Sequence, residues 1–213
     1  MLMPLAVREL IEKALRAVQD HSQHALLPVH RSRIYKAIGP LSNSTSYQVR
    51  GHLELLCARR GLVIWQQAHS QDNRAEQLLF LARRVFAGQI DHEIAKKEVE
   101  QAQNWLSNDY KERTEKLAQK CFYVLAAIIE ATYVVLGYDR WYNITIHKDE
   151  TDSDLDPWSS DTAKWTAAAL AGPVWESGYD SCKRLEFWKW WLTEAISLAY
   201  QKALFKKHVA DHL

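Results

Sequence analysis

The chain has 213 residues, of which 47% are hydrophobic and 25% are charged, a balance typical of a folded globular domain and not of a disordered chain. Its formal net charge of +1 argues against a protein that binds nucleic acid through an overall positive charge. Seven glycines and five prolines are too few for a turn-rich β fold, and three widely spaced cysteines form neither a disulfide framework nor a Cys-x-x-Cys metal site.

The first third of the chain is predicted to be helical because apolar residues repeat at intervals of three and four. Gly39-Pro40 is a strong stop signal for one of these helices. Gly51 and Gly61 lower the intrinsic helix propensity of another. The predicted helices are residues 5–18, 31–38 and 49–68, with a polar loop at 42–46.

Two capping signals follow in the middle of the chain. Asn73 with Glu76 can begin a helix that ends near Gly88. Asp91 can cap the next helix, which is predicted over residues 92–106.

A third signal, Asp109 with Glu112, can begin a long helix that ends at Gly137. Residues 121–138 are the most apolar stretch and approach the length of a membrane span, but Glu130 in the middle would be costly in lipid. A buried core helix is the better interpretation, with Glu130 either in a structural ion pair or acting as a catalytic acid. Its candidate partners are Arg59 and Arg140.

Strand signals are thin, since only residues 141–147 alternate apolar and polar, and these could equally form an extended connector. We therefore expect an all-α fold in a single domain, residues 1–213, with seven or eight helices and a long acidic connector at about 139–160.

The last helices have clear capping residues. Asp161 is expected to cap a helix over residues 162–171, and Asp180 or Ser181 to cap a final helix that reaches about residue 209. The final helix is rich in aromatic residues. Trp188 and Trp191 are expected to be buried, Phe187 lies outside the main apolar face, and Trp190 could be buried or exposed.

Charge is unevenly distributed along the chain. Residues 1–60 carry nine basic and four acidic side chains, whereas residues 121–180 carry three basic and ten acidic ones. Most of the acidic excess lies in residues 149–161, here called the acidic segment. Either it neutralises basic helices of the same domain, or it forms an acidic face for a basic partner.

Two patterns resemble metal sites. Asp152, Asp154 and Asp156 imitate the start of a calcium loop, but Pro157 stands where that loop needs glycine, and no glutamate follows at its twelfth position. A looser cation site of these three carboxylates is the alternative function. His208 and His212 have a spacing used by zinc, yet they lie at the chain end, where helices fray. We assign no resident metal, cofactor or catalytic residue.

Other functions have weaker signals. Nucleic-acid binding would depend on a basic set in the N-terminal portion and is not favoured, because the rest of the chain offsets it. That set is Arg31, Arg33, Lys36, Arg50, Arg59 and Arg60. The N-terminal charges are unlike those of a signal peptide, so the cytoplasm is the expected location, with no membrane association.

Three strings in the last third form a specific pattern: TDSDLDPWSSDTAKWTAAALAG (residues 151–172), PVWESGYDSCKR (173–184) and EFWKWWLTEAI (186–196). This pattern resembles the fifth family of predicted immunity proteins of bacterial polymorphic toxin systems. A weaker likeness lies in HRSRIYKAIG (30–39). The resemblance implies a mostly α-helical protein, not an enzyme, that binds and neutralises a cognate toxin and so protects the producing cell. Arg184 matches an arginine of the family pattern.

The resemblance leaves two roles open for the patterned residues. As contacts for the toxin, the candidates are Asp152, Asp154, Asp156, Trp158 and Trp190. As structural residues, they are Asp161, Arg184, Trp188, Trp191 and Glu130. In the structural interpretation Arg184 pairs with the acidic segment and fastens it to the last helix. Toxin contacts then come from less patterned residues, such as 42–47 or 68–104.

Overall fold

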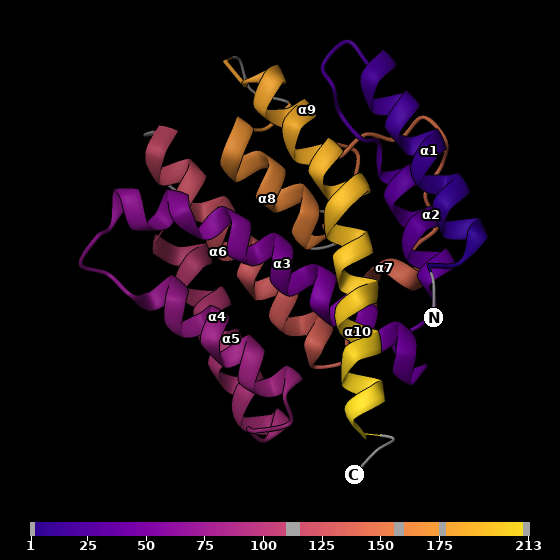
Figure 1. The fold of residues 1–213 in the computed structure, drawn as a ribbon. Coiled ribbons are helices and arrows are strands. Elements are labelled where there is room, and N and C mark those ends of the chain that lie inside the picture. Colours follow the sequence, from indigo (N-terminus) through magenta and orange to yellow (C-terminus); the bar gives the residue numbers. More distant parts are fainter. Residues whose placement is uncertain (1–2, 110–115, 156–159, 175–177, 211–213) are drawn as a thin grey trace.

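The computed structural model describes residues 3–109, 116–155, 160–174 and 178–210. Over these residues it is helical and has no strand, which confirms the predicted all-α class. The helices, shown in Figure 1, are α1 (Leu5–Asp20), α2 (Pro28–Ile38), α3 (Ser44–Ala68), α4 (Arg74–Phe86), α5 (His92–Asp109), α6 (Lys116–Val135), α7 (Arg140–Asn143), α8 (Thr162–Ala171), α9 (Ser181–Trp190) and α10 (Ile196–Ala210).

Helices α3, α6 and α8 pack on one another at the centre of the bundle, with α4 and α5 on one flank and α1 and α2 on the other (Figure 1). Two apolar clusters fill the interior. Val49 and Leu53 of α3 join the cluster of α1, α2 and the C-terminal helix, whereas Ala58 and Trp65 of α3 join the cluster of α4, α5 and α6. Helix α8 also contributes to both clusters, so α3 and α8 tie the two together.

Several helix starts follow the capping signals. Asp91 Oδ1 accepts hydrogen bonds from the backbone N–H groups of Glu93 (2.9 Å) and Ile94 (3.2 Å). Asp180 Oδ1 accepts one from Lys183 N (3.0 Å), as predicted. Each side chain satisfies N–H groups that have no partner within the helix.

Two helix starts differ from the prediction. Pro28 occupies the first turn of α2, where its fixed φ and missing N–H are tolerated, so this helix begins before residue 31. The predicted loop at 42–46 is mostly helix, because Asn43 Oδ1 accepts from Ser46 N (3.0 Å) and starts α3 at Ser44.

Two other predicted caps are not seen in the described residues. Asn73 precedes α4 but makes no capping hydrogen bond with its side chain, and Asp72 accepts from Arg74 N instead (3.0 Å). Helix α5 continues to Asp109, and the Glu112 of the proposed capping box lies outside the described residues.

Of the two interpretations of residues 141–147, the strand is not formed. Asp139 accepts a hydrogen bond from Tyr142 N (3.2 Å) and caps the one-turn helix α7, after which residues 144–147 have no regular structure. The predicted acidic connector is therefore not one continuous loop. Its start is helical, and residues 156–159 lie outside the described part of the chain.

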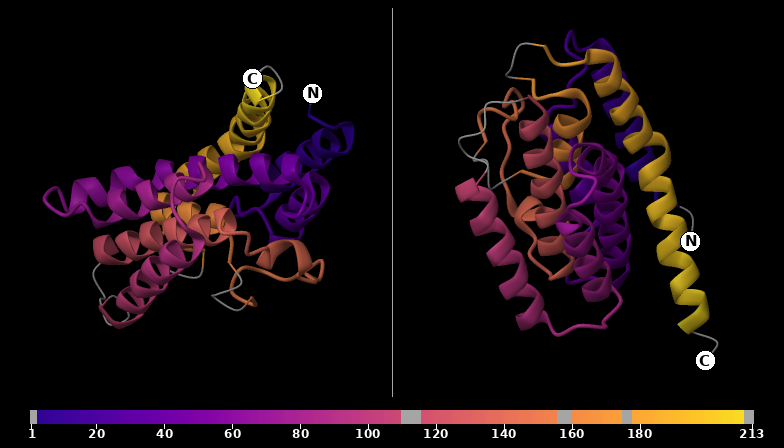
Figure 2. Two further views of the ribbon diagram at one scale, coloured as in Figure 1. Left: turned by 90° about the horizontal axis from the view of Figure 1, so that it is seen from below. Right: turned by 90° about the vertical axis from the view of Figure 1, so that its left-hand side faces the viewer.

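The C-terminal helix runs along the outside of the molecule (Figure 2). Between α9 and α10 it contains one π-helical segment, η2 (Trp191–Ala195), which shifts the register of the side chains around the helix. Trp188 and Trp191 are buried as predicted, and Phe187 is buried as well, contrary to the expected face. The C-terminal helix, from α9 to α10, counts as one helix. On this count, and leaving out the one-turn helix α7, the described residues contain eight helices, which agrees with the predicted seven or eight.

Helix α6 is long and apolar enough to cross a membrane by length and composition, and no other helix of the described residues is. Of its most apolar window, 78% is buried inside the protein. Helices α3, α4, α5 and α8 pack around α6. The structure therefore confirms the prediction of a buried core helix.

Gly51 makes a close contact between α3 and α4, and we expect Gly51→Ala to reduce the free energy of unfolding by about 1–3 kcal/mol. A Cβ atom at this position would lie 2.3 Å from Cε2 of the buried Phe86 ring, which would have to move. Gly61→Ala is the matched control on the same helix, since its Cβ would be 3.7 Å from the nearest atom. It should be neutral or stabilising. Equal melting temperatures for the two variants would contradict this account.

Candidate functional site

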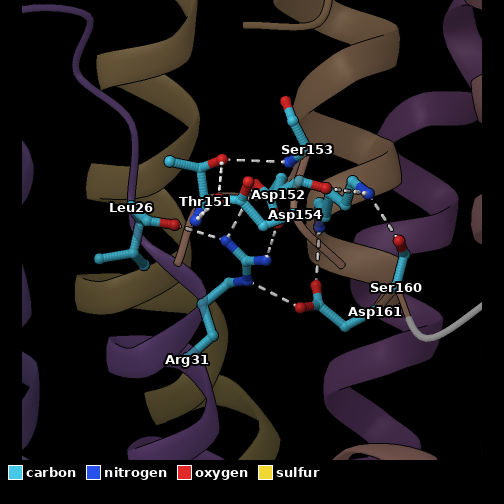
Figure 3. A network of polar contacts seen from close by, with 9 residues as sticks. Leu26, Arg31, Thr151, Asp152, Ser153, Asp154, Ser160 and Asp161 are labelled. Carbon is cyan, nitrogen blue, oxygen red and sulfur yellow. Dashed lines mark hydrogen bonds and ion pairs between the residues drawn. The ribbon is translucent and has the colours of Figure 1, made fainter. Parts of the chain in front are cut away.

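Arg31 lies at the centre of a buried charge network (Figure 3). Its side chain is 0% exposed. Nε donates to Asp161 Oδ2 (2.7 Å), Nη1 donates to the Leu26 carbonyl oxygen and to Asp152 Oδ2 (3.3 Å), and Nη2 donates to Asp152 Oδ1. One guanidinium on α2 thus binds two carboxylates that lie more than 120 residues later in the chain. We use "charge network" for Arg31, Asp152, Ser160, Asp161 and Lys164.

The carboxylate of Asp161 has two roles. While Oδ2 accepts from Arg31, Oδ1 accepts from Lys164 N (2.7 Å) and caps α8 as predicted. The Lys164 side chain folds back to donate to Ser160 Oγ (2.6 Å) and to the carbonyl oxygen of Asp152 (3.3 Å). The start of α8 and the acidic segment are therefore fastened together at one place.

Two tryptophans enclose the Arg31 guanidinium, whose central carbon lies 5.2 Å from the Trp141 ring centroid and 5.5 Å from that of Trp188. Such cation–π contacts favour a desolvated arginine. Burial alone would lower the pKa of Arg31, but the carboxylates of Asp152 and Asp161 raise it, so the guanidinium stays charged. In contrast, desolvation lowers the pKa of Lys164.

This network supports the internal-neutralisation interpretation for part of the acidic segment. Asp152 is bound by Arg31, with 10% of its side chain exposed, so it is not an open contact for a partner. Asp154 is exposed, and its Oδ2 accepts from Thr151 N and Oγ1 (both 2.7 Å). Asp156 and Trp158 lie outside the described residues, so their roles stay predictions.

Trp190 lies away from the charge network. It is half-buried on α9, and the Arg60 guanidinium of α3 lies 4.3 Å from its ring centroid. Glu186 approaches the same arginine at 3.6 Å. Trp190 therefore remains a candidate contact on a different part of the surface.

The predicted pairing of Arg184 with the acidic segment is not seen as a hydrogen bond among the described residues, although burial lowers the pKa of Arg184 and the charges of Tyr179 and Asp152 oppose that shift. Arg184 is buried, but its Nη2 donates to the Gly172 carbonyl oxygen, and its guanidinium lies 4.5 Å from the Tyr179 ring centroid. It therefore connects α9 to the end of α8. Among the described residues, the arginine that bonds to the acidic segment is Arg31.

A second buried ion pair lies near the first. Arg50 of α3 donates from Nη1 to Asp139 Oδ1 (2.6 Å), and its guanidinium lies 5.1 Å from the Tyr35 ring centroid. Asp139 Oδ2 also accepts from Leu41 N (3.1 Å). The pair thus joins α3, the loop before it and the start of α7.

Glu54, one turn after Arg50 on α3, is fully buried beside these pairs. Burial raises its pKa to about 7, and the charge of Asp161 adds to the shift, while Thr162, Arg50 and Tyr35 oppose it. No motif in the sequence singles out this carboxyl group.

Glu130 is buried on α6, as expected, and lines the same small cavity as Arg50 and Glu54. Its charge raises the pKa of Lys164. Of the two predicted partners, Arg59 is exposed on α3, and the Arg140 side chain is not among those described. Within the described residues the cavity measures about 10 Å³, a size that suits one water molecule rather than a substrate.

The charge network and the second ion pair remove Arg31 and Arg50 from the basic set considered for nucleic acid. Arg60 stacks on Trp190, and Lys36 donates to the Ile144 carbonyl oxygen (3.0 Å). The looser cation site also finds no support. In the described parts of the chain no group of three or more His, Cys, Asp or Glu residues could hold a metal ion. His212 and the side chain of His208 are not described.

A larger concave surface lies on another face. Helices α4 and α5 both pack on α6 and touch each other less, which leaves a groove of about 600 Å³ between them. We call it the α4–α5 groove. Its floor is apolar and its rims are polar. The floor residues are Leu78, Leu81, Ala102, Leu125 and Ile129; Arg74, Gln77, Glu98, Gln101 and Trp105 complete the lining.

The resemblance noted in the last third of the chain extends over most of its length. A family model described as immunity protein Imm5 matches residues 11–198. The match includes the whole charge network, both walls of the α4–α5 groove and all three patterned strings. No curated protein matches the chain.

Proposed function

The chain belongs to the Imm5 family of immunity proteins, and we propose on this basis that it binds a cognate bacterial toxin and blocks its active site or another essential surface. In this proposal the protein works by stoichiometric occlusion and turns over no substrate. The observation that carries it is the family match over residues 11–198.

The geometry is consistent with a binding protein. The most tightly organised ionisable groups, Arg31 with its two carboxylates, are bound to one another and surrounded by tryptophans. We take this buried ion network as part of what specifies the fold, since removing one partner would leave a buried charge uncompensated. The patterned strings then act chiefly as scaffold, and the toxin-binding surface lies elsewhere on the molecule.

The partner is a toxin domain of a polymorphic toxin system, made by the same or a kin bacterium. The protein would act in the cytoplasm of the producing cell, where newly made or incoming toxin must be neutralised.

Co-expression tests this function directly. The C-terminal domain of the large toxin encoded beside this gene is induced in a laboratory bacterium, with or without this protein. We expect growth only when the protein is present, together with a stoichiometric complex of the two chains on size-exclusion chromatography. An inactive toxin variant controls for the burden of expression. Equal killing in both strains would refute the proposal.

A further inference from the structure

The α4–α5 groove is the strongest candidate for the surface that contacts the toxin. We propose that it receives an amphipathic α-helix of the toxin domain, an inference that rests on the proposed function. The groove lies in residues 74–129, outside the patterned strings and largely within the segment in which contacts are expected to vary between family members.

The shape of the groove fits a helix. Two helices form its walls and a third forms its floor, so an inserted helix would complete a packed layer in the way a fourth bundle helix does. Leu78 and Leu81 of α4 and Ile129 of α6 offer an apolar floor to the apolar face of such a helix.

A large exposed apolar side chain stands beside this floor. Ile94 is 52% exposed, and its spacing to Glu98, Gln101 and Trp105 places it on the groove face of α5. Exposed apolar groups next to an apolar groove mark an interaction site.

One end of the groove has the residue types that dominate binding energy. Trp105 is half-buried there, and the Arg74 guanidinium lies 4.0 Å from its ring centroid. Tryptophan and arginine are enriched among the residues that contribute most to protein–protein affinity.

The two walls carry opposite charge, which defines the flanks of the occupant. Among the charged residues that line the groove, Arg74 lies on α4 and Glu98 lies on α5. The complementary helix therefore presents an acidic residue toward Arg74, a basic residue toward Glu98 and an apolar stripe between them.

The binding test uses the purified toxin domain encoded beside this gene, in catalytically inactive form. Ile94→Asp and Glu98→Arg alter exposed groove residues and should each weaken binding by about 30-fold or more. Phe205→Asp and Glu100→Arg are matched controls, since Phe205 is 77% exposed on α10 and Glu100 lies on α5 away from the groove face. Both controls should stay within about threefold of the unmodified protein.

The outcomes separate the two proposals. If the unmodified protein does not bind the toxin domain, the proposed function fails and this inference fails with it. If all four variants bind as tightly as the unmodified protein, only the groove assignment is overturned. If the protein self-associates, and Ile94→Asp abolishes this self-association without weakening toxin binding, the groove binds a second copy of this chain. That outcome would also overturn the groove assignment.

A photo-crosslinker at Gln101 tests the helical occupant. It should attach to toxin residues spaced by three, four and seven positions, which share one helix face. Attachment at alternate residues would indicate a strand and overturn the inference.

Discussion

Arg31→Met is expected to reduce the free energy of unfolding by about 3–5 kcal/mol, because it leaves two buried carboxylates without their cation. Asp152 and Asp161 would then have to be protonated or hydrated, and the Leu26 carbonyl oxygen would lose its donor. Methionine keeps an unbranched apolar stem but is shorter than arginine, so the loss would report the missing guanidinium with its charge and hydrogen bonds. Urea unfolding at pH 7, followed by circular dichroism, measures it.

The matched control is Arg33→Met, which removes an exposed arginine from the same helix and should change stability by less than about 0.5 kcal/mol. Arg31→Lys keeps the charge but cannot bind two carboxylates with a planar fork, so it should be intermediate. Asp161→Asn removes the negative charge that faces Arg31 but keeps a side-chain oxygen that can accept the capping hydrogen bond from Lys164 N. If Arg31→Met were as stable as Arg33→Met, the charge network would not hold the acidic segment in place.

The local features of this fold could be predicted from the sequence because their causes are local. Asp91, Asp161 and Asp180 each bond to a backbone N–H three residues later, so capping residues suffice to find them. The burial of Trp188 and Trp191 follows from their bulk and apolar area. Neither feature requires knowledge of which helices pack together.

The charge network could not be predicted, since its partners are distant in the chain and many arginines were equivalent as partners. The family resemblance directs attention to Arg184, whereas Arg31 makes the bonds seen among the described residues. A signal was present, however. Arg31 precedes buried Ile34 and Tyr35 by three and four positions, so it lies on the buried stripe of α2.

The same signal applies to α3, where Arg50 precedes buried Leu53, Glu54 and Cys57 by three, four and seven positions. A charged residue on an apolar stripe requires a buried partner of opposite charge. The stripe thus identifies which arginines are internal, although it does not name the carboxylates that they bind. The α4–α5 groove is also hidden from the sequence, because it depends on how two helices sit on a third.

Glu54→Gln is expected to stabilise the protein at alkaline pH by up to about 3 kcal/mol, with little effect near pH 5. The pKa of Glu54 rises from 4.5 to about 7 on folding, so the folded state holds a proton that the unfolded state releases. Its contribution to stability is therefore greatest below pH 4.5 and is lost as the pH rises to about 7. The glutamine side chain stays neutral and keeps an oxygen acceptor.

Urea unfolding of both proteins between pH 5 and pH 8.5 measures this difference. Burial lowers the pKa of His21 and His30, which makes stability fall with acid below about pH 6.5. Both histidines are present in both proteins, so their contribution cancels when the two curves are subtracted. Glu76→Gln, on α4, controls for loss of a carboxyl group in general. A difference between Glu54→Gln and the unmodified protein that stays constant over this range would mean that Glu54 is already ionised at pH 5 in the folded state.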